Sequence, residues 1–546
     1  MTIKGGQLKE KEDFQKLILD YLENENGYVR RDSKAFNAGF AMDTEMLFEF
    51  LNKTQSDEIE VLRKLYGEQI EDTIINYLNN EINKDYRSLI DVLKNGIEFD
   101  TGVKLNLMYR KPATSFNKEA MINYSKNIFS VMEEVYYKKD ERIDLVIFLN
   151  GLAIMTFELK CNVAGQSYED AIYQYRTERN PKTRLFLFKA GALVNFAMDL
   201  FEVYMTTQLK GSSTFFLPFN KGSGYGIESG KGNPHNENGL DVSYMWEDIL
   251  SKETLLYLID KIIYLKREKK KDEKTGKYKK SETLIFPRYH QFNAVRKLVQ
   301  DIRINETSRN YLIEHSAGSG KTNTIAWLSH RLASLHNSKD EVIFDTICVI
   351  TDRIVVDRQL QDAVMGLEHK EGLIKVMDDK CTSHDLAKAL NGNTKIIVTT
   401  IHKFMYIKDI VDNLKEKNFA IIIDEAHSST SGAAMESVSY TLSSLVMVAE
   451  GKPPYEVVDE ETLQDKIEKE IQRSGKPDNV SMIAFTATPK FTTLQLFGNM
   501  NSEGKKTSFD LYSMKQAIEE GFILDPLKNY VTYKTYFKVN KIVDSD

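Results

Sequence analysis

The chain has 546 residues, enough for about three or four domains, and its 42% hydrophobic and 28% charged residues are typical of a soluble globular protein. It has no apolar run of the roughly 18 residues that a membrane span requires, and its first residues lack the apolar core of a signal peptide. Three cysteines without metal-site spacing favour a reduced, cytoplasmic protein, while the net charge of −7 neither indicates nor excludes a local basic groove for nucleic acid.

The first hundred residues carry the pattern of amphipathic helices. Apolar side chains recur at a spacing of about 3.6 residues between positions 10 and 24, and the pattern stops at Gly27. A second helix is predicted after Asp43, and helix continues to about residue 95. These apolar stripes indicate a core, and they indicate no function.

Charged residues terminate two apolar, β-rich runs within residues 142–160. The runs flank Asn150-Gly151, a strong signal for a two-residue hairpin turn. Asp144 lies near the start of the first run, and Glu158 and Lys160 close the second. The two carboxylates could hold Mg²⁺ while the lysine steadies the attacking hydroxide and the developing charge. The alternative is a surface strand that ends in charged residues.

A regular two-residue turn conflicts with such a metal site. It sets Asp144 opposite Phe157 and therefore turns Glu158 and Lys160 toward the other face of the sheet. Because metal chemistry needs the three charged side chains together, we predict a three-residue loop, a β-bulge or a bend near Asp144. Regular pairing with the carboxylates on opposite faces would exclude the nuclease site.

Four segments follow before the next motif. A helix is predicted over 167–175 and a strand over 183–190. The glycines and the Asn-Pro turn of residues 216–246 predict a loop. Residues 266–280 carry nine basic residues against three acidic ones and are predicted to form a linker or hairpin. A solvated segment explains this charge better than phosphate contact does.

Residues 311–328 predict a short strand, a glycine turn and a helix. Such a loop lets backbone N–H groups approach a phosphate at a helix N-terminus, where the dipole favours negative charge. The glycines permit the approach, the lysine reaches the terminal phosphates, and the threonine hydroxyl binds Mg²⁺. The loop residues expected to bind nucleotide are Gly318, Ser319, Gly320, Lys321 and Thr322. His315 takes the position that a strict Walker A pattern gives to glycine, which argues against a small GTPase.

Two later strands carry matching chemistry. Residues 419–427 form an apolar run that ends in Asp424 and Glu425. Asp424 would hold Mg²⁺, and Glu425 would orient or deprotonate the attacking water. Residues 483–490 form another buried run that ends in Thr-Ala-Thr. Each could be an ordinary strand before a polar loop, but the three in this order resemble motifs I, II and III of superfamily 2 helicase motors.

Further motifs extend the resemblance to nearly the whole chain. D-x13-E-x-K resembles the PD-(D/E)xK nuclease motif. Together with the loop over 216–246, the segments NGLAI…ELK, PRYHQ, HSAGSGKT, TDR and YSMKQAIEEGFIL make the chain similar to the restriction (R) subunit of Type I restriction–modification enzymes. The resemblance implies an α/β protein, with a PD-(D/E)xK nuclease domain followed by a RecA-like parallel-sheet helicase domain. It also implies ATP and Mg²⁺ as cofactors, double-stranded DNA as substrate, cleavage after ATP-driven translocation, and methyltransferase and specificity subunits as partners.

The resemblance also suggests roles for single residues. Gln291 of PRYHQ would read adenine. Arg353 and Thr400, at two strand ends, would contact the DNA backbone. Gln174 lies near a Q-x3-Y pair that contacts DNA in some of these nucleases, although Glu178 stands where the tyrosine would be. Loop solvation is the alternative for the strand ends, and a solvated helix residue is the alternative for Gln174.

The resemblance implies a division of the chain. The expected parts are an endonuclease domain over 1–260, a basic linker or hairpin over 261–283, a first motor domain over 284–505, and the beginning of a second, truncated motor domain over 506–546. The alternatives are a Type III-like or stand-alone helicase–nuclease, and a DNA-binding assembly module with a silent nuclease. The hairpin at Asp144 precedes the motor, which favours the Type I interpretation, and intact Asp144, Glu158 and Lys160 argue against a silent nuclease.

Overall fold

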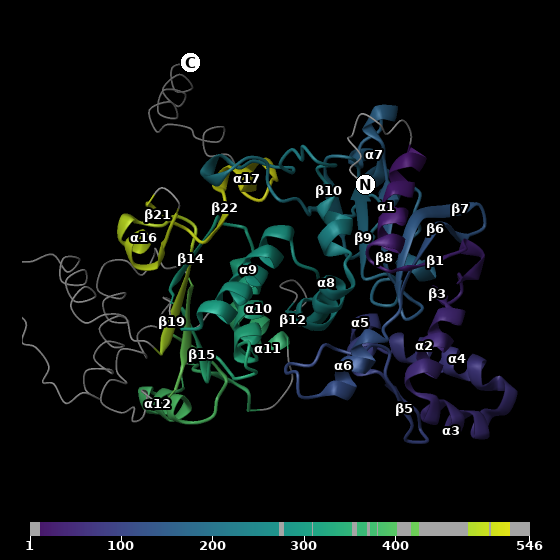
Figure 1. Cartoon of the computed structure of the whole chain (residues 1–546), viewed down its shortest axis with the longest axis horizontal. Coiled ribbons are helices and arrows are strands. Elements are labelled where there is room, and N and C mark those ends of the chain that lie inside the picture. Colours follow the sequence, from purple (N-terminus) through teal and green to yellow (C-terminus); the bar gives the residue numbers. More distant parts are fainter. Residues whose placement is uncertain are drawn as a thin grey trace, which may run out of the picture.

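Two α/β units lie side by side in the computed structural model (Figure 1). The structure describes residues 11–271, 278–307, 309–351, 358–367, 372–378, 380–400, 417–424, 479–501 and 504–524. The N-terminal unit holds a nine-stranded mixed sheet, and the second unit holds a seven-stranded parallel sheet. None of the described helices is long and apolar enough to cross a membrane.

Helices form most of the first hundred residues, as the sequence predicts. They are α1 (Lys11–Asn24), α2 (Thr44–Thr54), α3 (Ser56–Tyr66), α4 (Ile70–Ile82) and α5 (Leu89–Asn95), and α6 (Lys118–Ser125) follows. The α1 helix buries Phe14, Ile18 and Leu22 on one face. The α2 helix starts after Asp43 because the Asp43 carboxylate caps it, accepting a hydrogen bond from the Met46 N–H at 3.2 Å.

The sheet of the N-terminal unit runs in the order β1-β6-β7-β8-β9-β10-β11. These strands are β1 (Val29–Arg31), β6 (Phe129–Lys138), β7 (Glu141–Leu149), β8 (Leu152–Leu159), β9 (Val194–Met198), β10 (Val203–Thr206) and β11 (Leu217–Pro218). The short β2 (Phe36–Asn37) and β3 (Met42–Asp43) pair with each other, and β3 also pairs with β8. Strands β6, β7 and β8 are antiparallel, whereas β8 and β9 are parallel and are connected through α7 (Tyr168–Thr177).

This sheet is covered on both faces. Leu145 and Ile147 of β7 join the core cluster that contains Phe14 of α1. The alternate residue Val146 joins the cluster that contains Tyr175 of α7. The alternation follows the two-residue period of a strand and places α1 and α7 on opposite faces.

The prediction of a strand over residues 183–190 is wrong. Residues Arg184–Phe186 form a single 3₁₀ turn, and the strand comes later, as β9. Leu185 and Phe186 are buried, so their apolar character serves the core without strand pairing. The turn is tight: a Cβ at Gly191 would lie 2.2 Å from the Leu185 carbonyl oxygen. The predicted loop over 216–246 is confirmed as largely irregular, with only β11, the 3₁₀ turn Gly226–Glu228 and the start of a π-helical turn, Met245–Ile249.

The basic segment forms an antiparallel hairpin of β12 (Tyr264–Lys271) and β13 (Tyr278–Ile285), so the hairpin alternative is confirmed. Its residues contact the N-terminal unit through two ion pairs, Arg267 with Asp91 at 2.7 Å and Lys189 with Glu282 at 2.8 Å. The hairpin therefore packs on the N-terminal unit where the chain crosses to the second sheet.

All strands of the second sheet are parallel, in the order β16-β17-β15-β18-β19-β14-β22. They are β14 (Tyr311–His315), β15 (Thr346–Thr351), β16 (Ile374–Val376), β17 (Ile396–Thr400), β18 (Phe419–Asp424), β19 (Val480–Thr486) and β22 (Asp510–Tyr512). The helices are α9 (Tyr289–Asn305), α10 (Lys321–Ala333), α11 (Arg358–Gly366), α12 (Ser383–Asn391) and α16 (Phe491–Phe497), and a small β-ladder joins β20 (Asn499–Met500) to β21 (Lys506–Thr507). Ile347 of β15 packs in the cluster that contains Leu328 of α10, and Cys348 in the cluster that contains Leu386 of α12, so helices cover both faces.

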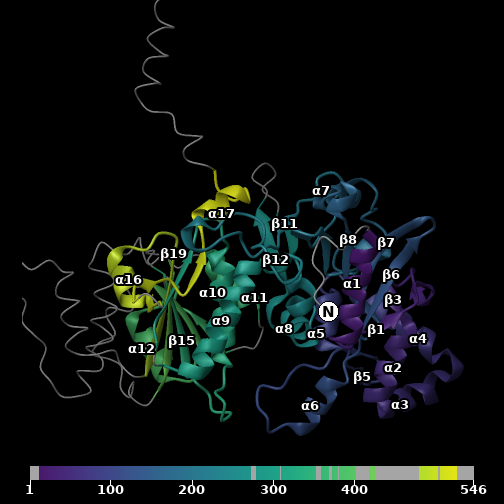
Figure 2. The same ribbon diagram turned by 45° about the horizontal axis from the view of Figure 1, so that its top comes forward.

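The end of the described chain differs from expectation. The sequence predicts that residues 506–546 begin a second motor domain, but β22 pairs with β14 and is an edge strand of the seven-stranded parallel sheet. The following helix α17 (Met514–Glu519) turns toward the N-terminal unit, as both views show (Figures 1 and 2). Ser513 Oγ donates to the Ser229 carbonyl at 2.5 Å, and the Lys231 N–H donates to Glu519 Oε2 at 2.8 Å. The described residues up to 524 therefore pack with the seven-stranded parallel sheet and with the N-terminal unit.

Candidate functional site

The hairpin of β7 and β8 turns through two residues. Asn150 has a φ of 49° and Gly151 a φ of 80°, and Leu149 pairs with Leu152. Both central residues are in the left-handed region, as a type I′ turn requires. A Cβ at Gly151 would lie 2.4 Å from the Asp43 carbonyl oxygen, so the α2 cap packs directly on this turn.

A β-bulge in β8 changes the register after the turn. Phe148 pairs with Ala153, but Ile147 pairs with Met155, which leaves Ile154 as an extra residue. Leu145 then pairs with Phe157, and the same register brings Asp144 opposite Glu158. The predicted β-bulge is therefore confirmed. It brings the two carboxylates onto one face in spite of the two-residue turn.

The carboxylates of Asp144 and Glu158 are both buried. Asp144 is 4% exposed, and its Oδ2 accepts a hydrogen bond from the Leu159 N–H at 2.7 Å. Lys11, at the start of α1, forms an ion pair with the same carboxylate. Glu158 is 1% exposed. Burial and the nearby charge of Asp144 raise the pKa of Glu158 to about 8, against the lowering effects of Arg179 and Lys160.

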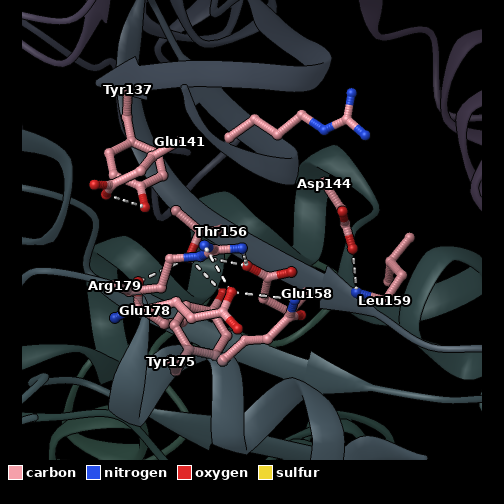
Figure 3. Close-up of polar contacts among 12 residues, drawn as sticks. Tyr137, Glu141, Asp144, Thr156, Glu158, Leu159, Tyr175, Glu178 and Arg179 are labelled. Atoms are coloured by element: carbon pink, nitrogen blue, oxygen red, sulfur yellow. Dashed lines mark hydrogen bonds and ion pairs between the residues drawn. The ribbon is translucent and has the colours of Figure 1, made fainter. Parts of the chain in front are cut away.

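Arg179 is the residue that sequence reasoning missed. It follows α7, its side chain is buried, and its Nε donates to Glu158 Oε1 at 2.6 Å (Figure 3). Tyr175 of α7 contacts Thr156, with 2.9 Å between the two hydroxyl oxygens. The available signal was a basic residue at the end of the helix that follows the charged strand. Its partner depends on how α7 packs on β8, which is a tertiary contact.

The donor set suits a hard divalent cation. Asp144 and Glu158 offer carboxylate oxygens, which are the ligands that Mg²⁺ prefers. Two carboxylates held together out of water repel each other, as the raised pKa of Glu158 reflects, and a cation between them would relieve that repulsion. No group of three or more His, Cys, Asp or Glu side chains in the described part of the chain could hold a metal ion. The remaining ligands would therefore be water or substrate oxygens.

Lys160 acts on the pair of Asp144 and Glu158, whereas Gln174 has no described hydrogen bond to it. Lys160 is 5% exposed, and its charge acts on Glu158. Gln174 is half-buried on α7, where its Nε2 lies 3.4 Å from Glu178 Oε2 and its Oε1 is buried without a hydrogen-bond partner. No described hydrogen bond joins Gln174 to either carboxylate, so its contact with DNA stays a prediction.

The glycine loop of the second sheet has the expected form. Gly318 and Gly320 have φ values of 71° and 80°, and α10 begins at Lys321. Lys321 Nζ lies 3.3 Å from the His315 carbonyl oxygen, so the ammonium folds back over the loop. Ser319 Oγ is buried without a hydrogen-bond partner, which is the kind of polar atom that a bound group could satisfy. Thr322 is the second residue of α10.

The start of α9 holds this loop through consecutive carbonyl groups. Arg288 Nη2 donates to the Gly318 carbonyl at 2.7 Å, His290 Nε2 lies 3.0 Å from the Ser319 carbonyl, and Gln291 Nε2 donates to the Gly320 carbonyl at 3.0 Å. Burial and Arg288 lower the pKa of His290, so its ring is neutral and donates through Nε2. The Gln291 Oε1 accepts from the Arg288 N–H at 2.9 Å. Both ends of the Gln291 amide thus bind protein, and base reading stays a prediction.

Polar strand ends gather at one edge of the parallel sheet. Thr351 aligns with both Thr400 and Asp424, and Glu314 aligns with Thr486. These positions lie at the carboxyl ends of their strands, where ligands bind in open α/β sheets. Asp424 ends β18, on the far side of β19 from the glycine loop. Glu425 and Arg353 lie outside the residues that the structure describes.

Two family models match the chain. Residues 7–214 match the model described as the Type I restriction enzyme R protein N terminus, and residues 290–545 match the SWI2/SNF2 ATPase model. The first match contains the carboxylate pair, and the second contains the glycine loop and the parallel sheet.

Curated relatives carry related descriptions. A putative type I restriction enzyme MjaVIIIP endonuclease subunit of Methanocaldococcus jannaschii is 24% identical over 410 residues, which cover 69% of this chain and 36% of that protein. The putative MjaVIIP endonuclease subunit of the same organism is 28% identical over 335 residues, covering 58% of this chain and 28% of that protein. The C-terminal part of the putative MpnIIP endonuclease subunit of Mycoplasma pneumoniae is 30% identical over 159 residues, covering 26% of this chain and 70% of that protein. The chain spans about a third of the length of the two Methanocaldococcus relatives.

A solved structure is also similar in part. The fragment of a putative HsdR subunit of a type I restriction enzyme from Vibrio vulnificus covers 70% of this chain and 51% of that chain, with 15% identity and a TM-score of 0.25.

Proposed function

This chain belongs to the R-subunit family of Type I restriction–modification enzymes and carries a SNF2-type ATPase domain, and from that premise we propose that it is the DNA-translocating and DNA-cleaving subunit of such an enzyme. In this proposal it acts in the cytoplasm on double-stranded DNA, together with methyltransferase and specificity subunits. It consumes ATP to translocate DNA and then cleaves it with Mg²⁺. The observation that carries the nuclease half is the β-bulge at Ile154, because it brings Asp144 opposite Glu158.

In the nuclease half, Asp144 and Glu158 would hold Mg²⁺. The ion supplies Lewis-acid polarisation of a phosphate oxygen and stabilises negative charge there. The Leu159 N–H orients Asp144 through its hydrogen bond to Oδ2. Lys160 places a positive charge beside the pair, where it steadies the attacking hydroxide and the charge that develops on the phosphate. Burial of the two carboxylates strengthens each of these electrostatic contributions.

In the motor half, the glycine loop binds the phosphates of ATP. Backbone N–H groups of Gly318, Ser319 and Gly320 surround the phosphates at the N-terminus of α10, and Lys321 swings from the His315 carbonyl to the terminal phosphate. Thr322 and Asp424 would hold the Mg²⁺ of the nucleotide. We assign the catalytic base to Glu425, adenine reading to Gln291, and DNA contacts to Gln174, Arg353 and Thr400.

The two activities fall in separate parts of the chain. We assign residues 1–260 to the endonuclease domain and the β12–β13 hairpin to the junction. The motor begins near residue 284 and, because β22 pairs with β14, includes the described residues to 524. The Arg296 guanidinium of α9 binds both oxygens of Asp248, at 2.6 and 2.7 Å, so the two parts contact each other through a bidentate ion pair.

The test is DNA cleavage by the full-length R subunit in complex with its partner subunits. Asp144→Ala, Glu158→Ala and Lys160→Ala are each expected to abolish cutting of plasmid DNA while ATP hydrolysis continues, because the two sites use separate metal ions. Glu169→Ala is the matched control, since Glu169 is an exposed acidic residue of α7. Loss of ATP hydrolysis in well-folded variants, or cutting by all three, would contradict the proposal. Absence of cutting by the wild-type complex would favour an assembly module with a silent nuclease.

A further inference from the structure

The Arg179 side chain meets the candidate metal site from the side of α7. Its Nε donates to Glu158 Oε1 at 2.6 Å, and its Nη2 forms an ion pair with the same oxygen. Both contacts go to Oε1, so the guanidinium does not span the two carboxylate oxygens. Figure 3 shows the Arg179 side chain directed at Glu158, while Asp144 is directed at the Leu159 backbone.

The position of the guanidinium is set by its surroundings. The Arg179 N–H donates to the Gln174 carbonyl at 3.2 Å and so extends the end of α7. Its Cζ lies 5.9 Å from the centre of the Tyr137 ring, and Nη1 lies 3.6 Å from Glu178 Oε2. The arginine side chain is 8% exposed. A buried guanidinium with several fixed contacts holds its partner carboxylate in one orientation.

The charge of Arg179 also favours the ionised carboxylate. Burial and Asp144 favour the protonated form of Glu158, and Arg179 together with Lys160 opposes them. A protonated carboxyl is a poor ligand for Mg²⁺, because metal ligands must give up their protons. Because both contacts from Arg179 go to Oε1, Oε2 is the oxygen that would bind a metal ion.

We propose that Arg179 is a positioning residue of the nuclease site, which holds the Glu158 carboxylate in one orientation through Oε1 so that a divalent cation binds beside Asp144. The proposal rests on the proposed nuclease function. The proposal differs from a simpler alternative, in which the guanidinium merely occupies the place of the metal ion. In that alternative Arg179 would compete with the metal ion, whereas a positioning residue strengthens metal binding.

The experiment measures Mn²⁺ binding to the whole chain, without nucleotide or DNA, by titration calorimetry. Arg179→Ala is expected to weaken Mn²⁺ binding about 10- to 100-fold, the range found for residues that orient metal ligands. Arg179→Lys should fall between the wild type and Arg179→Ala. Arg176→Ala is the control, since Arg176 lies on α7, three residues before Arg179, and donates to the Thr214 carbonyl instead.

The outcomes separate the proposals. Unchanged or tighter Mn²⁺ binding by Arg179→Ala, or equal losses in Arg179→Lys and Arg179→Ala, overturns the role of Arg179. Binding by the wild type that Glu158→Gln leaves unchanged overturns the metal site itself, and with it the nuclease half of the proposed function. Thermal unfolding shows whether Arg179→Ala is folded, and if it is not, Mn²⁺ binding by Arg179→Lys decides the question.

Discussion

At the scale of single residues, Glu158 combines two demands that oppose each other. Its carboxylate is buried beside Asp144, which favours the protonated form, yet it must be ionised to bind a cation. The positive charges of Arg179 and Lys160 lower the pKa of Glu158 and so oppose the effects of burial and Asp144. Active sites are where burial and like charge are found together, so the raised pKa of Glu158 supports a functional role for the pair.

The raised pKa has a consequence for stability. Between the unfolded-state pKa of about 4.3 and the folded-state value of about 8, the folded metal-free chain holds a proton on Glu158 that the unfolded chain has released. The contribution of this residue to the free energy of unfolding therefore falls as the pH rises through that window. We expect urea unfolding to show the wild type losing stability relative to Glu158→Gln between about pH 5 and pH 8, with Mg²⁺ reducing the loss. An identical pH dependence in both proteins would contradict this assignment.

Residue roles could be predicted from the sequence only where the signal is local. Asp144, Glu158 and Lys160 stand at the ends of strands that their own neighbours define. The parity of those strands was enough to predict a three-residue loop, a β-bulge or a bend, and the structure has the bulge. Arg179 could not be identified in this way. Its contact with Glu158 depends on the packing of α7 over the sheet, and a basic residue at a helix end is common for reasons of solvation and the helix dipole.

At the scale of elements, the β7–β8 turn is the feature on which the proposed nuclease site depends. Gly151 has a φ of 80°, and a Cβ there would lie 2.4 Å from the Asp43 carbonyl oxygen and 2.6 Å from the Leu47 nitrogen. Gly102 has a φ of 82° with nothing within 4 Å of its Cβ position. The two glycines thus share the backbone conformation and differ in their surroundings.

Replacing each glycine with alanine separates these effects. Gly102→Ala is expected to cost about 1–2 kcal/mol, the strain of a left-handed alanine. Gly151→Ala is expected to lower the free energy of unfolding by about 1–3 kcal/mol more than Gly102→Ala does, because backbone atoms of the α2 cap must move. Denaturant unfolding measures both values, and cutting in the full complex shows whether the turn still aligns Asp144 with Glu158. Equal losses of stability for the two variants would show that the α2 cap yields without cost.

The elements that the sequence predicts well are those with strong local patterns: the hairpin, the glycine loop and the buried parallel strands. The errors have a common cause. Residues 183–190 are apolar enough for a strand, but they are buried as a turn, and propensity alone does not distinguish the two. Similarly, nothing local to residues 510–512 indicates that β22 returns to pair with β14, which lies about two hundred residues earlier in the chain.

At the scale of the whole molecule, the two units are tied together close to the nucleotide loop. Trp327 of α10 donates its indole N–H to the Ile262 carbonyl at 2.9 Å, and α17 contacts the loop around Ser229. A Cβ at Gly318 would lie 3.2 Å from the Phe522 carbonyl oxygen, so the segment that follows α17 also covers the glycine loop. A change at the nucleotide loop thus has direct packing routes to the N-terminal unit.

Lys321→Ala tests whether cleavage depends on the motor. Lys321 is the group expected to neutralise the terminal phosphates, so its loss should stop ATP hydrolysis in the full-length subunit with its partners. Cutting should stop as well, because in the proposed sequence of events the DNA is cleaved only after translocation. The carboxylate pair lies in the other unit and is unaltered, so Mn²⁺ binding without nucleotide should persist. Lys339→Ala, at an exposed lysine beyond α10, is the control for a lost positive charge. Plasmid cutting by Lys321→Ala at the wild-type rate, with hydrolysis absent, would mean that the nuclease works independently and that the two halves are joined in the chain without being coupled in action.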